Sequence, residues 1–306
     1  MTVEVCRRQH KSLSTERTYV HWLKRYMAAL SMMPDGLTSE KKLERFLSEL
    51  ALRHDVSAST QNQAFNAVCF FYKCVIERPL KNVDALRATR PMRVRHAPSV
   101  QETGELIKAV RNVGGYPTNL ITRLLYGCGL RVTEPLNLRI KDVSLDAGRF
   151  VIRGAKGRKD RVLAIPCSLV EEITGQIQAA RAVWQRDQKI HLPVALEHRL
   201  AEKYPEYQFA WPWAWLFPAR WPCKHPRTGE LVRYRMHEAN VQRAIKEARR
   251  RIGIMVLPHE LRHAYATHTL DRGVNIKALQ AAMGHVDVNT TLGYCHAEAC
   301  SVPSPL

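Results

Sequence analysis

The sequence predicts a mainly α-helical fold with a small β-sheet, divided into an N-terminal helical domain and a larger mixed α/β domain. Three observations support this prediction. Apolar residues recur with helical spacing through residues 14–78, an arginine- and proline-rich stretch follows at 86–98, and two β-type runs at 150–153 and 161–165 interrupt a second helical region. The chain has 306 residues and 45% hydrophobic content, which is enough to bury one or two ordinary cores.

The N-terminal region contains three amphipathic patterns. Within each pattern, apolar side chains repeat at three- and four-residue intervals and so share one helix face. They are Tyr19, Leu23, Tyr26 and Leu30, then Leu43, Phe46, Leu47 and Leu50, then Phe65, Val68, Cys69 and Tyr72. Polar or turn-forming residues at 35–36 and 55–59 separate the patterns. We therefore predict a helical bundle in residues 1–88, a linker at 89–98 and a second domain at 99–306.

The second domain alternates helical and β-type patterns. We predict helices at about 100–127, 133–139, 236–252, 259–272 and 275–283, the last two ending at Gly273 and Gly284. The two β-type runs flank Gly154–Asp160, and together they predict a hairpin with a basic tip. Ser168–Glu171 has the form of a capping box at the start of a further long helix.

Charge and composition restrict the class of partner. Lys and Arg number 47 against 28 for Asp and Glu, which gives a formal charge of +19 and predicts a polyanionic partner. No stretch approaches about 18 uncharged apolar residues, and no apolar segment of a secretion signal precedes Lys11. We therefore expect no membrane partner. The eight cysteines include no Cys-x-x-Cys pair, so we expect reduced thiols in a cytoplasm.

His259-Glu-Leu-Arg-His263 matches the H-E-x-x-H pattern of zinc proteases, in which two histidines share one helix face. A five-residue match has little specificity. A zinc protease would need a third ligand, and it would have no evident use for the positive charge or for Tyr294. We therefore expect no metal site.

A set of ordered motifs accounts for more of the chain. They are Gly129-Leu-Arg131-Val-Thr-Glu134, Gly154-Ala-Lys156-Gly-Arg-Lys159-Asp-Arg161, His259-x-x-Arg262-His263, Gly284-His285 and Tyr294. Their order and context resemble the tyrosine recombinase (phage integrase) family, and Ser12–Trp22 is similar to the start of its SAM-like core-binding domain. The resemblance implies DNA-clasping by the N-terminal domain and strand cleavage by the C-terminal one.

The resemblance also implies catalytic roles, each of which has a physical rationale. Arg131 and Arg262 would clamp the scissile phosphate, because a guanidinium offers paired donors and stays charged. Lys156 would protonate the leaving 5′-oxygen, with Lys159 as its rival. His259 and His285 would hydrogen-bond the phosphate, and Tyr294 would form a 3′-phosphotyrosyl link without ATP, metal or cofactor.

Two further residues have open assignments. Glu134 follows Arg131 by three residues, so an ordinary i, i+3 ion pair that orients Arg131 competes with a direct catalytic role. His263 would either support the catalytic set or be simply a satisfied polar residue. A lone Arg or Lys is usually a solvated surface charge, and a lone Tyr usually belongs to a core, so the argument depends on the set.

The segment between Lys156 and His259 is longer than simple family members need, and we place an insert at about 190–222. It resembles the extra segment of integron integrases. Its candidate DNA-binding residues are His198, Tyr204, Pro205, Trp211, Trp213, Trp215 and Trp221. Two interpretations remain open: a tryptophan-rich mini-core that anchors a loop, or flat aromatic faces that hold unstacked bases, each stack contributing about 1–3 kcal/mol.

This narrower resemblance implies a substrate and an assembly. It implies recombination of gene cassettes between folded single-stranded attC hairpins and duplex attI sites, by a homo-tetramer on two DNA sites in the bacterial cytoplasm. The short tail at 295–306 leaves open whether a C-terminal helix is passed between protomers. The alternatives are a phage-type or chromosomal recombinase acting on duplex sites, or a catalytically silent DNA-binding protein.

Overall fold

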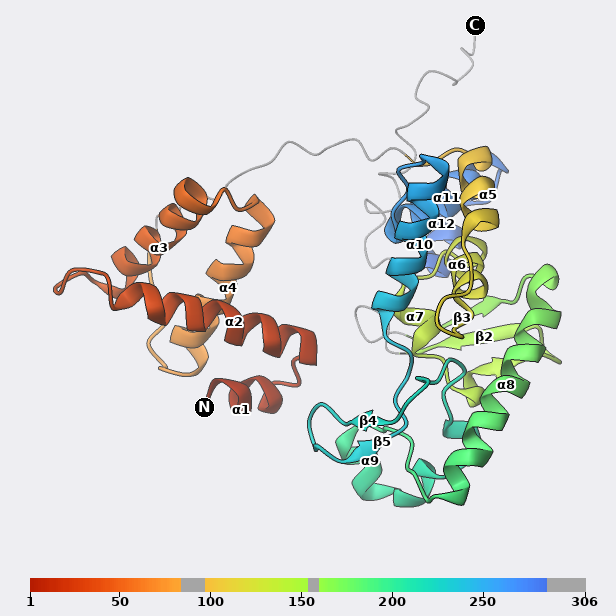
Figure 1. The fold of residues 1–306 in the computed structure, drawn as a ribbon. Coiled ribbons are helices and arrows are strands. Elements are labelled where there is room, and N and C mark those ends of the chain that lie inside the picture. The colour runs from red at the N-terminus through yellow and green to blue at the C-terminus, as the bar shows by residue number, and fades with distance from the viewer. Residues whose placement is uncertain (84–96, 154–159, 285–306) are drawn as a thin grey trace, which may run out of the picture. The chain divides into compact units, whose positions relative to one another are not determined.

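The computed structural model describes residues 1–83, 97–153 and 160–284. The chain divides into two compact units, Met1–Arg93 and Val94–Leu306, and each is described by itself. Both are mostly helical, and the strands of the larger unit are short (Figure 1). The predicted fold class, mainly α with a small β-sheet, is therefore confirmed. Of the predicted linker, only residues 97 and 98 are among those described.

The first unit contains four helices in its described part: α1 (Thr2–Arg8), α2 (Leu13–Leu30), α3 (Ser39–His54) and α4 (Ala58–Cys74). The three predicted amphipathic helices are confirmed, and α1 was not predicted. The side chains of Ser12, Thr38 and Ser57 each accept a hydrogen bond from a backbone N–H three residues later, which starts α2, α3 and α4.

The apolar stripes of α2, α3 and α4 form one core. Tyr26, Leu43 and Val68 each have none of their surface exposed, and they come from the three different helices. Tyr26 packs edge-to-face on Phe46 at 5.3 Å between ring centroids. The spacing of apolar residues in the sequence therefore identified the buried faces of this unit correctly.

The second unit begins with α5 (Val100–Ala109), α6 (Thr118–Gly127) and α7 (Thr133–Leu136), and it also contains α8 (Val170–Lys189), α9 (His198–Lys203), α10 (Glu238–Ile252), α11 (Pro258–Asp271) and α12 (Ile276–Met283). Its strands are β1 (Val143–Ser144), β2 (Arg149–Ile152), β3 (Arg161–Ala164), β4 (Cys223–Lys224) and β5 (Leu231–Val232). Short 3₁₀ turns lie at Ile140–Asp142, Cys167–Leu169, Pro205–Gln208 and Trp211–Trp213.

The elements of this unit fall into three groups along its length. Figure 1 shows α5, α6, α10, α11 and α12 gathered at one end, the sheet of β1 to β3 in the middle, and α9, β4 and β5 at the other end. The main core lies between the helices and the sheet, and it includes Leu124 of α6, Phe150 of β2 and Ile245 of α10. The core thus joins helices on one side to the sheet on the other, and Ile173 of α8 also contributes to it.

The sheet is antiparallel in the order β1-β2-β3. Phe150 pairs with Leu163, and Ile152 pairs with Arg161. Along β3, Arg161 and Leu163 are buried while Val162 is 58% exposed, as strand alternation requires. The predicted hairpin strands are present, whereas its basic tip, residues 154–159, lies outside the described part of the chain.

Three local predictions need correction. The helix predicted over 100–127 is two helices, because residues 110–117 form a turn in which Gly114 and Gly115 have positive φ. The helix predicted over 133–139 ends at Leu136. The capping box at Ser168–Glu171 does not form, because a 3₁₀ turn absorbs Ser168 and α8 begins after Leu169, without a side-chain cap.

Candidate active site

The site begins at a glycine turn between α6 and α7. Gly129 has φ of +60°, and a Cβ there would overlap the ring of Tyr265 on α11, so only glycine allows this close approach. The chain then reaches Arg131 and enters α7, whose first turn contains Pro135. The sequence Gly-Leu-Arg therefore sets Arg131 at the start of a short helix, pressed against α11.

Glu134 binds Arg131 from within that helix. The Arg131 backbone N–H donates to Oε2 of Glu134 at 2.8 Å, and its Nη1 donates to Oε1 at 2.9 Å. The i, i+3 ion pair considered from the sequence is therefore present. Arg131 keeps 27% of its side chain exposed, whereas Glu134 is buried. Such a carboxylate orients the arginine and leaves part of its guanidinium accessible.

Arg262 reaches the same carboxylate from α11. It is 1% exposed, and its Nη1 lies 3.7 Å from Oε2 of Glu134. Nη1 also donates to the Gly129 carbonyl at 2.5 Å, and Nη2 donates to the Met283 carbonyl at 2.6 Å. Arg262 thereby joins the glycine turn, α11 and the end of α12. The structure thus brings together two arginines that are far apart in sequence.

Arg161 of β3 is a member of this cluster that the sequence interpretation did not select. Its Nη1 and Nη2 donate to the two oxygens of Glu134 at 3.0 and 2.7 Å. The available signal was strand alternation, because Arg161 is in phase with Leu163 and Ile165 and therefore faces inward. We define the arginine cluster as Arg131, Arg161 and Arg262 around Glu134.

The arginine cluster has an excess of positive charge. Burial raises the pKa of Glu134, but the hydrogen bond and charge of Arg161, followed by the Arg131 N–H and the Arg262 charge, together lower that pKa below its ordinary value. Glu134 is consequently ionised at neutral pH. One carboxylate against three guanidinium groups leaves two positive charges, which suit an anionic phosphodiester.

The two histidines of α11 differ in exposure. His259 lies in the first turn and is exposed, whereas His263 is buried one turn later. Their rings pack edge-to-face with centroids 4.5 Å apart. Within residues 1–83, 97–153 and 160–284, no group of three His, Cys, Asp or Glu side chains is placed to hold a metal ion.

Four of the predicted site residues lie outside the described part of the chain: Lys156, Lys159, His285 and Tyr294. The residues that flank them are described. Asp160 and Arg161 follow the hairpin tip, and Gly284 ends α12 with φ of +63°, immediately before His285. A Cβ on Gly284 would lie 3.2 Å from Nη1 of Arg161, so the C-terminal end of α12 packs on the arginine cluster.

The insert contains a layered aromatic group. Tyr204 stacks on Tyr207, and Tyr207 stacks on Trp213, with 4.9 Å between centroids and 19° between planes in both cases. Nζ of Lys141 lies 2.8 Å from the Trp213 ring centroid, which extends the stack with a cation. Pro205 begins the 3₁₀ turn that carries Tyr207, and His198 begins α9.

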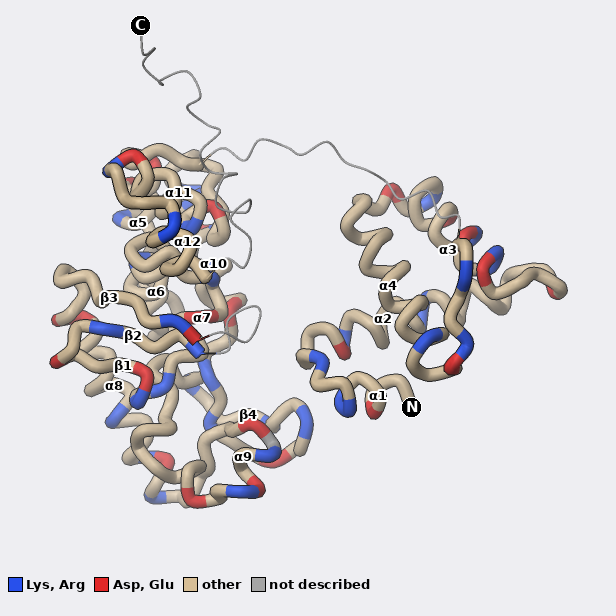
Figure 2. Tube along the Cα trace, turned by 180° about the vertical axis from the view of Figure 1, so that it is seen from behind, with Lys and Arg blue, Asp and Glu red and all other residues tan. Residues whose placement is uncertain are grey.

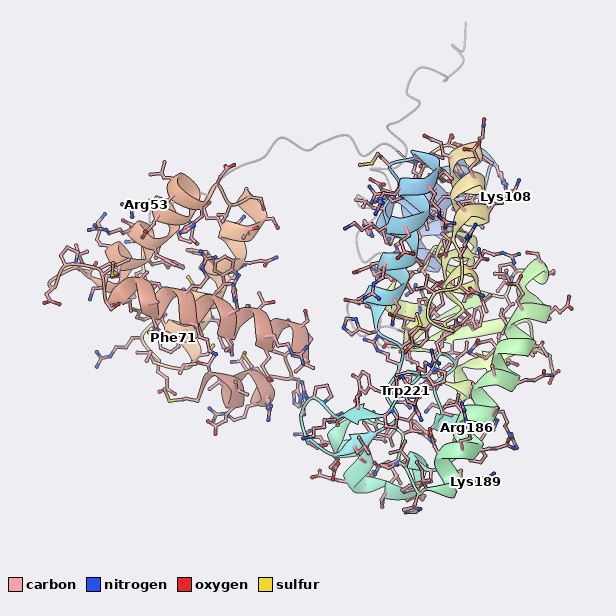
Figure 3. The ribbon with its side chains drawn as sticks, viewed as in Figure 1. Arg53, Phe71, Lys108, Arg186, Lys189 and Trp221 are labelled. Carbon is pink, nitrogen blue, oxygen red and sulfur yellow. The ribbon has the colours of Figure 1, made fainter. Side chains whose placement is uncertain are left out.

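The tryptophans of the insert divide by burial. Trp215 is 8% exposed, it donates through Nε1 to the Arg233 carbonyl at 3.2 Å, and Arg139 lies 3.7 Å over its ring. Trp211 is half-buried against Trp184 of α8. Trp221, which is labelled in Figure 3, is 72% exposed. The mini-core interpretation therefore fits Trp215, whereas Trp221 has a face available for a ligand.

Comparison with known proteins identifies the family. Residues 99–300 match the model "Phage integrase family", and residues 2–82 match "Phage integrase, N-terminal SAM-like domain". The chain belongs to the phage integrase family. The protein is thus a tyrosine site-specific recombinase, an enzyme that cleaves and rejoins DNA. The predicted N-terminal SAM-like domain is also confirmed.

Individual relatives cover nearly the whole chain. An "Integrase/recombinase" of Escherichia coli is 37% identical over 303 residues, which are 97% of this chain and 89% of that protein. "Tyrosine recombinase XerA" of Thermococcus kodakarensis is 31% identical over 288 residues, 93% of this chain and 85% of that one. Among solved structures, XerH site-specific recombinase bound to palindromic difH substrate has a TM-score of 0.61 and is 18% identical in sequence. The match covers 94% of this chain and 78% of that one, and it shows a shared fold.

Two bulk properties accompany this assignment. Lys and Arg residues occur on both units (Figure 2), and they outnumber Asp and Glu in the sequence. Among the described residues, no helix is both long and apolar enough to span a membrane. DNA binding is consistent with the net positive charge and with the recombinase family.

Proposed function

We propose that this recombinase cleaves DNA with Tyr294 as nucleophile and with Arg131, Lys156, His259, Arg262 and His285 as its catalytic partners. The arginine cluster is the observation that carries the proposal. Arg131, which lies just before α7, and Arg262 of α11 meet at Glu134 and concentrate positive charge next to Gly284, which precedes His285. Hydrogen-bond donors that are already in place there would stabilise the negative charge on a bound phosphate in the transition state.

Each partner has a role that follows from its chemistry. Arg131 offers its exposed edge to the phosphate, and Arg262 supplies a buried charge and aligns the three segments that it joins. Lys156 protonates the leaving 5′-oxygen, with Lys159 as the alternative proton donor. His259 and His285 donate hydrogen bonds to the phosphate, while Glu134 and His263 support the arginines and His259.

The metal-free chemistry has a definite atom balance. The Tyr294 oxygen forms a bond to phosphorus, the bond from phosphorus to the 5′-oxygen breaks, and the Tyr294 proton passes to a base while a proton is delivered to the 5′-oxygen. The phosphotyrosyl link preserves the energy of the phosphodiester. Strand rejoining is the reverse reaction with another 5′-hydroxyl, so it needs neither ATP nor a cofactor.

We further propose that the substrate includes folded single-stranded attC-type hairpins as well as duplex attI-type sites, as for integron integrases. The insert at about 190–222 supports this, since it combines a stacked aromatic group with the exposed indole of Trp221. Unpaired bases that protrude from a hairpin stack on such faces. Residues 1–88 and 99–306, joined by the linker at 89–98, would grip the DNA in a tetramer on two sites.

The test is covalent trapping on a denaturing gel, with a labelled attC-type hairpin and a duplex of the same sequence, in EDTA. Wild-type protein should form an adduct on the hairpin, and Tyr294→Phe should form none while binding DNA normally, because only a hydroxyl is lost. An adduct with Tyr294→Phe would refute the nucleophile assignment. Chelator sensitivity together with stoichiometric zinc would favour the H-E-x-x-H alternative instead.

The same experiment separates the substrate alternatives. An adduct confined to the duplex would favour a phage-type or chromosomal recombinase. Tight binding without any adduct would favour a catalytically silent DNA-binding protein. Sedimentation of the protein with two DNA sites would then test the proposed tetramer.

A further inference from the structure

Arg161 is buried because it lies on the inward face of strand β3. It opens β3 and pairs with Ile152, so its side chain points to the same face as Leu163 and is 9% exposed. A guanidinium on an inward strand face is costly unless it is paired and hydrogen-bonded. The structure supplies those partners, and all of them belong to segments that hold the proposed catalytic residues.

Three donors of Arg161 are used by two different segments. Nη1 and Nη2 bind the two Glu134 oxygens, and Nε donates to the Ala282 carbonyl at 2.8 Å. Glu134 in turn binds Arg131, and Ala282 lies in the last turn of α12, three residues before His285. Arg161 itself follows Lys156 by five residues. One side chain therefore ties β3 to α7 and α12.

The pairing also determines how much of Arg131 is available to a phosphate. Arg131 donates to Glu134 through its own backbone N–H and Nη1. Arg161 donates to both oxygens of the same carboxylate through Nη1 and Nη2. If Arg161 were absent, the buried carboxylate would lose its strongest partner. It would then attract Arg131 and Arg262 more strongly, in competition with the phosphate.

We propose that Arg161 is a positioning residue of strand cleavage, which neutralises Glu134 so that Arg131 keeps donors for the scissile phosphate and which fixes β3 to the end of α12. The proposal rests on the proposed function. Arg161 does not itself contact the DNA in this mechanism. Its loss should therefore reduce the rate of the chemical step far more than the affinity for DNA.

The first test compares Arg161→Lys with Arg233→Lys in the full-length protein. Arg233 is a matched control, since it is 8% exposed and binds both oxygens of Asp187 at 2.7 and 2.6 Å, away from the arginine cluster. Arg161→Lys should lower the single-turnover cleavage rate on a nicked suicide substrate by about 10- to 100-fold at saturating DNA, because a lysine cannot make the paired contacts. Arg233→Lys should lower the melting temperature and leave that rate within about threefold.

The second test removes the charge that Arg161 neutralises. Arg161→Met removes the side chain that binds both oxygens of Glu134, so that the carboxylate has only Arg131 and Arg262 as charged partners, whereas Arg161→Met with Glu134→Gln removes the carboxylate charge as well. We expect the double variant to cleave at least about tenfold faster than Arg161→Met, because the competition for Arg131 disappears. A purely structural role would make the two losses add, and the double variant would then be the slower one.

The outcomes are distinct from those that test the proposed function. If wild-type protein forms no Tyr294-dependent adduct, the proposed function fails. If wild-type cleaves but Arg161→Lys cleaves within threefold of it, or the double variant is slower than Arg161→Met, the positioning role is overturned. Should Arg161→Lys not fold, the comparison of the two Met variants decides: a double variant that cleaves faster than Arg161→Met supports the role, and one that is equally fast or slower overturns it.

Discussion

At the scale of single residues, the site depends on one buried carboxylate and on one glycine. Glu134 has three guanidinium groups around it, from the turn before α7, from β3 and from α11. Gly129 supplies the carbonyl that Arg262 binds, in a conformation that other residues rarely adopt. These two residues have no catalytic chemistry of their own in the proposed mechanism, yet they determine where Arg131 and Arg262 lie.

Gly129→Ala should destabilise the protein more than an equivalent change elsewhere. Its methyl group would collide with Tyr265 in addition to the strain of positive φ, so we expect a loss of about 2–4 kcal/mol. Gly148→Ala is the control, because Gly148 has φ of +56° and no described atom within 4 Å of an added Cβ, which predicts about 1 kcal/mol. Urea unfolding measures both, and equal losses would contradict the steric argument.

The stability supplied by Glu134 should disappear in acid. Because its folded pKa lies below the ordinary value, the carboxylate stabilises the fold above about pH 4.3, and this contribution is lost as the pH falls through the lower folded pKa. Glu134→Gln should therefore cost about 3–5 kcal/mol at neutral pH and progressively less below about pH 4.3. Urea unfolding at a series of pH values measures this, with Glu171→Gln, at an exposed site, as the control.

At the scale of elements, sequence periodicity predicted helices and strands well where one face is buried. The amphipathic stripes of α2, α3 and α4 and the alternation of β2 and β3 are formed as expected. The predictions were less accurate where local geometry competes. The Ser168 capping box was wrong, because its residues fit a capping pattern but the chain enters α8 through a 3₁₀ turn.

The insert is the element whose interpretation changes most with the structure. The sequence left two interpretations of its tryptophans open: they form a mini-core, or they form a surface that binds bases. Burial now separates them, since Trp215 packs under Arg139 and Trp221 is exposed. The mini-core interpretation therefore holds for Trp215, whereas base binding stays a prediction for the exposed ring of Trp221.

Replacing these tryptophans should have opposite consequences. Trp215→Ala should cost about 3–5 kcal/mol of stability, because it empties a buried site and leaves the Arg233 carbonyl without that donor. Trp221→Ala should change stability by less than about 0.5 kcal/mol and weaken binding to a hairpin with protruding bases by about 1–3 kcal/mol. Thermal unfolding and binding to hairpin and duplex measure the pair, and equal weakening on both DNAs would argue against base capture.

At the scale of the whole molecule, charge dominates the expected behaviour. The formal charge of +19 is spread over both units, so binding to DNA should release many counterions (Figure 2). Affinity for any DNA should then fall by about 10³-fold or more between about 50 and 200 mM salt. Titrations at several salt concentrations measure the slope, which the uncharged change Trp221→Ala should leave unaltered. A loss below about tenfold would contradict a phosphate-dominated interface.

The sequence by itself determined the class of fold, the buried faces of the main helices and the family, because periodicity, composition and ordered motifs are properties of the chain alone. It also selected Arg131, Glu134 and Arg262 as members of one site. Only the tertiary structure decided that Arg161 joins them and that Trp215 is buried while Trp221 is not. Those facts depend on which segments meet in space, and a buried charge or an exposed ring is defined by its neighbours rather than by its position in the chain.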